Sequence, residues 1–182
     1  MLPPLPSWDG LHPIIVHFPI ALLLVAPILV LIGSFVPNKT RSFLMAAFIV
    51  MLIGTISTWI AVSTGEEAGE LAERMANVEA VLENHEELAE TTSKVFTALT
   101  AIFGVIVFAP MLFKKELPNF ALSVLNIAFL VFYGAGGVLL INTAHEGGRL
   151  VHEFGVRAVM NSTAQNNASP IQLKKGDDDD DD

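Results

Sequence analysis

Four long apolar segments constrain this chain more than any other feature. They cover residues 13–36, 42–63, 95–113 and 120–141, and short polar breaks separate them. A helix needs about 20 apolar residues to cross the hydrocarbon core of a bilayer, where only helices and closed barrels satisfy their backbone polar groups. The segments therefore predict an all-α fold, a four-helix transmembrane bundle that occupies residues 13–159 as one membrane domain.

Composition supports the membrane class, because 52% of the residues are hydrophobic and only 16% are charged. No Lys or Arg precedes the first apolar segment, so we expect it to be a retained span and not a cleaved signal peptide. We expect residues 1–12 to form a short outer segment. Residues 160–182, which end in a run of six aspartates, are expected to be a disordered polar tail.

The basic residues of two short loops predict the orientation of the bundle. Lys39 and Arg41 lie between the first two spans, and Lys114 and Lys115 lie between the last two. The positive-inside rule places both loops in the cytoplasm. We therefore expect a multi-pass protein of a bacterial inner membrane, with both termini and the long connection at residues 65–93 outside.

The connection at residues 65–93 is rich in helix formers and contains nine glutamates. Its apolar side chains recur at three- and four-residue steps and form a stripe of Val78, Val81, Leu82, His85, Leu88, Ala89 and Thr92. This pattern predicts that spans two and three extend beyond the bilayer as an outer helical hairpin, with a turn near Asn77.

Five histidines, His12, His17, His85, His145 and His152, all fall at or beyond the predicted outer face. His85 lies on the apolar stripe and is expected to point into the bundle. His12 and His17 are about 140° apart on a helix, so they cannot serve one centre from one helix face. We expect His17 to be the inward one, because apolar residues surround it, and His12 to lie at the helix cap before Pro13.

His145 follows the last span, and Gly147 and Gly148 are expected to break or bend the helix just beyond it. His152 is a secondary candidate. The expected inward groups are thus His17, His85 and His145, of which two would ligate one haem. A second haem would need His12 or His152.

Several neutral imidazoles in an apolar bundle indicate a b-type haem, whose iron takes axial nitrogens from facing helices. The chain has no cysteine, which excludes covalent attachment of a c-type haem within it. Several small residues lie near the predicted site. They either give room for the macrocycle or only allow close helix packing. These residues are Ala61, Gly65, Gly134, Gly136 and Gly137. The alternative is a non-haem zinc, iron or copper site with carboxylates from Glu66, Glu67, Glu86 or Glu146.

The opening LHPIIVHFPIALLLVA and the closing HEGGRLVHEFGV resemble a widespread bacterial family of uncharacterised four-helix membrane proteins. Its signature is HPxxVHFPIAL near the start and a double glycine followed by LV and an aromatic residue after the last span. The resemblance covers residues 11–159 and implies similarity to transmembrane di-haem b-type cytochromes. It marks His12, His17, His85 and His145, whereas His152 stands where an aromatic residue is expected.

The expected function is that of a membrane b-type cytochrome with haem b near the outer face. It would relay electrons between a membrane quinone pool or membrane complex and a periplasmic partner, and the histidine count permits two haems. A structural or docking subunit of a larger respiratory or photosynthetic complex is the alternative, and a metal-dependent membrane enzyme is a third interpretation. No nucleophile motif or phosphate-binding loop is present, and the acidic outer surface argues against nucleic acid as a partner.

Overall fold

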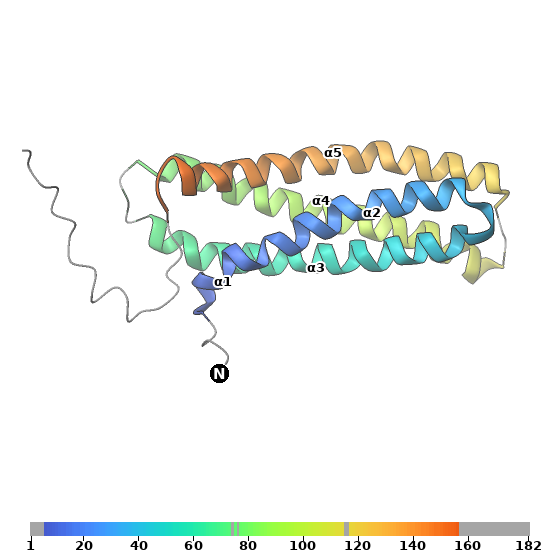
Figure 1. The fold of residues 1–182 in the computed structure, drawn as a ribbon, viewed down its shortest axis with the longest axis horizontal. Helices are drawn as coiled ribbons and strands as arrows, with labels where there is room; N and C mark the ends of the chain where they lie inside the picture. The colour runs from blue at the N-terminus through green and yellow to red at the C-terminus, as the bar shows by residue number, and fades with distance from the viewer. Residues whose placement is uncertain (1–5, 74, 76, 115–116, 157–182) are drawn as a thin grey trace, which may run out of the picture.

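The computed structural model describes residues 6–73, 75, 77–114 and 117–156. Its helices are α1 (Trp8–Ile15), α2 (His17–Phe35), the short 3₁₀ helix η1 (Pro37–Lys39), α3 (Thr40–Ala72), α4 (Glu79–Phe113) and α5 (Asn119–His152). Each long helix packs against the next in sequence, and α2 also packs against α5, which closes the ring (Figure 1). The predicted all-α four-helix bundle is thereby confirmed.

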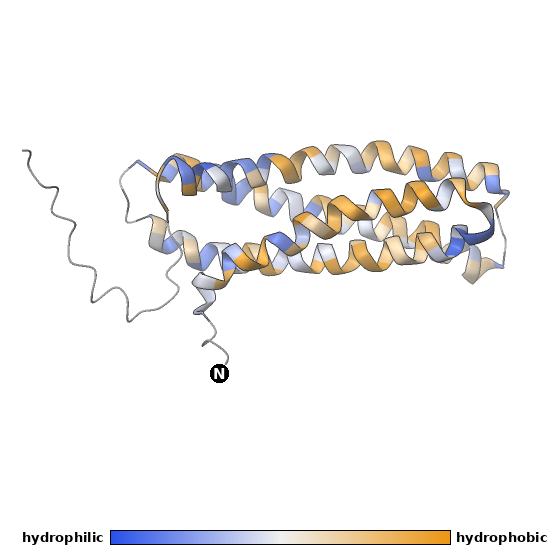
Figure 2. Cartoon of the chain, in the orientation of Figure 1, coloured by the Kyte–Doolittle hydropathy of each residue, from blue (hydrophilic) through white to orange (hydrophobic). Residues whose placement is uncertain are grey.

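Apolar residues predominate along the middle of the four long helices, and hydrophilic residues gather at the end near the α3–α4 hairpin (Figure 2). Each contains a segment apolar enough to cross a membrane, and only 22% to 33% of that segment is buried within the chain. Large side chains such as Phe120, Leu112 and Val131 are among the most exposed. A bundle in water would hide these side chains, so their exposure indicates that lipid is the solvent of this surface.

Hydroxyl groups inside the bundle form hydrogen bonds from one helix to the next. The Thr55 and Thr100 hydroxyls lie 2.7 Å apart between α3 and α4, and those of Thr92 and Thr143 lie 2.9 Å apart between α4 and α5. The Trp59 indole N–H donates to the Thr97 hydroxyl at 3.0 Å. In a bilayer these bonds satisfy polar groups that have no water nearby, and they fix the register of adjacent helices.

The predicted outer hairpin of α3 and α4 is present, and its turn includes Asn77 in the left-handed region with φ of 66°. One expectation about the last helix was wrong. It is not broken at Gly147 and Gly148, because α5 continues to His152. The predicted tail at residues 160–182 lies outside the described residues.

A break at Val16 separates α1 from α2 and tilts α1 toward α3 (Figure 1). Pro19 has no N–H to donate to the Ile15 carbonyl, which is the bond that would continue the helix. Helical structure begins at Trp8 and not at the expected Pro13, so His12 lies within α1. The tilt of α1 positions His12 over α3.

Pro27 leaves a second gap in the backbone bonding of the first span. Lacking an N–H, it cannot donate to the Leu23 carbonyl one turn earlier. The buried Tyr133 hydroxyl on α5 donates to that carbonyl instead, at 2.7 Å. One side chain thus satisfies the backbone group that the proline leaves unpaired and also links α2 to α5.

We expect Tyr133→Phe to destabilise the bundle by about 1–2 kcal/mol, because it leaves the buried Leu23 carbonyl unpaired. Reversible unfolding in mixed micelles would measure this cost. In a Pro27→Ala background the carbonyl regains a helical N–H, so Tyr133→Phe should then cost clearly less. An equal cost in both backgrounds would contradict this assignment of the hydrogen bond.

Candidate functional site

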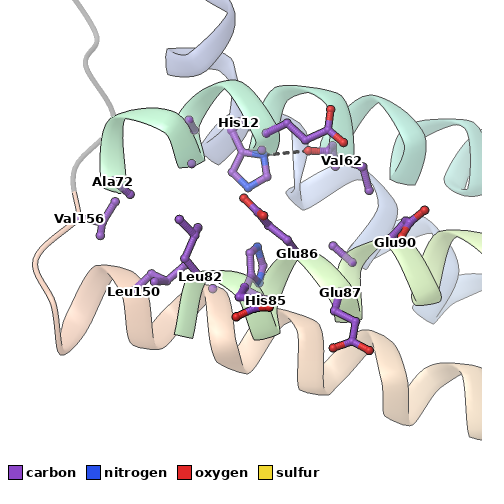
Figure 3. Close-up of a pocket in the computed structure, with 18 of the residues that line it drawn as sticks. His12, Val62, Ala72, Leu82, His85, Glu86, Glu87, Glu90, Leu150 and Val156 are labelled. Carbon is purple, nitrogen blue, oxygen red and sulfur yellow. Dashed lines mark hydrogen bonds between the residues drawn. The ribbon is translucent and has the colours of Figure 1, made fainter. Parts of the chain in front are cut away.

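A cavity of about 420 Å³ lies at the end of the bundle where the α3–α4 hairpin projects. Side chains of α1, α3, α4 and α5 line it, and His12 from α1 and His85 from α4 both face it (Figure 3). The two imidazole ring centres are 6.4 Å apart, and the ring planes are inclined by 83°. A smaller cavity of about 70 Å³, also lined by both histidines, lies on the side toward the bundle core.

The His12 ring is held by α3. Its Nδ1 lies 3.0 Å from the Ala61 carbonyl oxygen and 3.1 Å from the Thr64 hydroxyl oxygen. A carbonyl can only accept, so Nδ1 carries the proton and donates. The neutral ring therefore has its free lone pair on Nε2, the nitrogen that can bind a metal.

The His85 ring is held by α5 in the same way. Its Nδ1 donates to the Thr143 carbonyl at 3.0 Å, so Nε2 again has the lone pair. His12 on α1 thus bonds to a carbonyl on α3, and His85 on α4 bonds to a carbonyl on α5, so the two halves of the chain use the same arrangement. Metal-binding histidines usually have this arrangement, in which one nitrogen is anchored and the other is available.

A glycine supports each of these rings, four residues after the carbonyl that accepts its hydrogen bond. A Cβ on Gly65 would come within 2.9 Å of the His12 ring, and a Cβ on Gly147 within 2.9 Å of the His85 ring. A Cβ on Gly69 would meet the Glu86 carboxylate. These three positions must stay free of a side chain for the imidazoles and Glu86 to lie where they do.

The cavity is strongly acidic. Its lining includes Glu66, Glu83, Glu86, Glu87 and Glu90, and no Lys or Arg is present among its described lining residues. The carboxylate of Glu86 interacts electrostatically with those of Glu73, Glu66 and Glu83. A cationic group or a metal centre with positive charge would be stabilised here.

The structure corrects the choice of inward histidines. His85 points inward, as the apolar stripe predicted, but His17, His145 and His152 are exposed, and His12 is the second inward residue. The prediction that His17 and His145 point inward was wrong. For His17 it depended on an apolar neighbourhood, which in a membrane helix is equally consistent with a surface facing lipid. No sequence pattern identified the Ala61 and Thr143 carbonyls, although the four-residue spacing to Gly65 and Gly147 occurs in both halves.

The other predicted residues divide between the cavity and its surroundings. Ala61, Gly65, Glu66 and Glu86 line the cavity. Glu146 forms an ion pair with Arg149 at 2.8 Å, and Glu67 is not among the lining residues. The remaining three glycines do not face it: Gly136 packs against Leu99 and Phe96, and the Cβ positions of Gly134 and Gly137 face open space.

Comparison with known proteins gives a family and no more. The family model described as "Predicted membrane protein (DUF2231)" matches residues 9–160. No curated protein and no solved structure matches the chain. The match includes all five histidines and every helix from α2 to α5.

We expect Gly147→Ala to destabilise the protein by about 1–3 kcal/mol, because the added methyl group would overlap the His85 ring. The adjacent Gly148→Ala is the matched control, since its Cβ would meet nothing within 4 Å. Alanine there should be neutral or slightly stabilising in the helix. Thermal unfolding in detergent measures both, and equal effects of the two substitutions would show that Gly147 is not the support of His85.

Proposed function

The chain belongs to this family of predicted membrane proteins, and we propose that it is a b-type haem protein in which His12 and His85 are the two axial ligands of one haem. One observation carries the proposal. Two imidazoles from different halves of the chain face one cavity, each anchored through Nδ1 to a main-chain carbonyl and each with Nε2 available.

The spacing of the rings fits a shared metal. Two imidazoles on opposite sides of one metal ion have ring centres roughly 6 Å apart, because each metal–nitrogen bond is about 2.0–2.1 Å long. The 6.4 Å between His12 and His85 agrees with this value. The adjoining cavity of about 420 Å³ is within the range of roughly 300–1,000 Å³ that is usual for cofactor sites.

The set of donor atoms favours haem over a bare metal ion. Within the described part of the chain, no group of three or more His, Asp or Glu side chains could hold a metal. Structural and catalytic zinc sites need three or four protein ligands, whereas the porphyrin brings four nitrogens and leaves two positions for the protein. Two histidines are therefore enough protein ligands for haem, but they are too few for a bare metal ion.

The residues around the site would set the properties of such a haem. Haem b with two histidine ligands supplies reversible one-electron transfer. The Ala61 and Thr143 carbonyls would fix the ring orientations and increase the basicity of both imidazoles. The carboxylates of Glu66, Glu83 and Glu86 would favour the ferric over the ferrous form, and so lower the reduction potential.

The position of the site supports a role as an electron carrier. The histidine pair lines the cavity at the hairpin end of α3 and α4, and this end of the bundle is the hydrophilic one (Figure 2). A haem there would be within reach of both a membrane quinone or membrane complex and a soluble redox protein on that side. The inward pair provides ligands for one haem, which is the number that we propose.

We expect His12→Ala and His85→Ala each to abolish haem binding or reduce it severely, because either change removes one of the two axial ligands. His17→Ala and His145→Ala are matched controls, since both residues are exposed, and they should retain the haem content of the unaltered protein. The pyridine haemochrome assay on protein made in haem-replete cells measures this.

An unaltered protein without haem would exclude the proposal. Elemental analysis of the same sample would then test the non-haem metal alternative. Haem that persists in His12→Ala but is lost in His17→Ala would leave the cytochrome class standing and overturn the ligand assignment.

A further inference from the structure

Another cavity, of about 260 Å³, lies at the opposite end of the bundle from the two cavities beside the histidines. It is lined by η1, the start of α3, the end of α4 and the start of α5. The lining has a polar part, formed by Asn38, Lys39, Thr40, Arg41, Ser42 and Asn119, and an apolar part that includes Leu44, Ile106, Val107, Met111 and Leu122.

The charge of this cavity is opposite to that of the histidine cavity. Lys39 and Arg41 contribute two positive charges, and no Asp or Glu is among its described lining residues. Neither residue forms an ion pair with a described carboxylate. Both side chains are exposed, so they can reach a ligand that enters the cavity from the membrane surface.

Backbone groups add to the attraction for an anion. The 33-residue α3 begins at Thr40 and the 34-residue α5 at Asn119, and neither has a side-chain hydrogen bond at its N-cap. Because the first residues of both helices line this cavity, both direct the positive ends of their dipoles toward it. On α4, Pro110 has no N–H to donate to the Ile106 carbonyl, so the usual helical bond to this oxygen is missing beside the cavity.

We propose that this cavity binds the headgroup of an anionic phospholipid, with the phosphate at Lys39 and Arg41. The observation that favours a lipid over a soluble anion is the apolar half of the lining, formed by Ile106, Val107 and Met111. This half continues into strongly exposed apolar side chains, Leu112 and Phe113, that face the bilayer. Basic pockets between transmembrane helices bind such headgroups in general. The proposal does not depend on haem.

The test is titration of the purified full-length protein in neutral detergent, with native mass spectrometry as the readout. The probes are phosphatidylglycerol, phosphatidylcholine of the same chain length and inorganic phosphate. We expect phosphatidylglycerol to bind in preference to phosphatidylcholine. Arg41→Gln and Lys39→Gln should each weaken phosphatidylglycerol binding about five-fold, the usual effect of one basic residue near a membrane surface.

Lys114→Gln is the matched control, because Lys114 lies at the same end of the bundle and does not line the cavity. It removes the same charge and should weaken binding much less. Equal binding of both lipids, or equal weakening by Arg41→Gln and Lys114→Gln, would overturn the proposal. Inorganic phosphate that binds as tightly as phosphatidylglycerol would show a soluble-anion site and would also overturn it.

Circular dichroism and gel filtration show which variants are folded, and Lys39→Gln tests the same cavity should Arg41→Gln fail to fold.

Discussion

Inside a bilayer a polar group has no water to bond, so it must find its partner on its own or a neighbouring helix. Much of the interior of this bundle follows from that constraint, although the buried Asn126 side-chain amide has no hydrogen-bond partner among the described residues. The Leu23 carbonyl, left unpaired by Pro27, accepts from Tyr133, and the inner threonine hydroxyls pair across helices. The inward histidines obey the same rule, because each donates its Nδ1–H to a helical carbonyl.

This hydrogen bond decides what the histidines can do. It fixes the tautomer, which leaves the lone pair on Nε2, and it fixes the plane of each ring. Because His12 is anchored to α3 and His85 to α5, the two rings meet at 83°. The glycines beneath them complete the arrangement, since a methyl group at Gly65 or Gly147 would displace the ring. The proposed haem site therefore depends on backbone groups as much as on the histidines.

The sequence predicted the fold well because the bilayer imposes one strong requirement, an apolar length that spans it. It also predicted the outer hairpin and the inward orientation of His85, because on an acidic helix an apolar stripe can face only the interior. The same reasoning failed for His17. In an apolar helix hydropathy does not separate the lipid face from the core face, so the apolar residues around His17 gave no direction.

His12 could not be selected from sequence because its orientation depends on the break at Val16, which tilts α1 against α3.

The continuity of α5 through Gly147 and Gly148 likewise depends on tertiary packing that the sequence does not show. Glycine weakens an isolated helix in water, but packing against α4 keeps α5 helical. Gly147 thus marks a place where the His85 ring approaches the backbone, and sequence alone could not distinguish this role from a helix end.

Electron paramagnetic resonance of the oxidised protein tests the shared ligation by His12 and His85 most directly. Two imidazoles with nearly perpendicular planes on one ferric haem give a low-spin signal of unusually large anisotropy. The proposal predicts this signal in the unaltered protein and its loss in His12→Ala. A high-spin signal, a low-spin signal typical of parallel imidazoles, or a signal that His12→Ala leaves unchanged would contradict it.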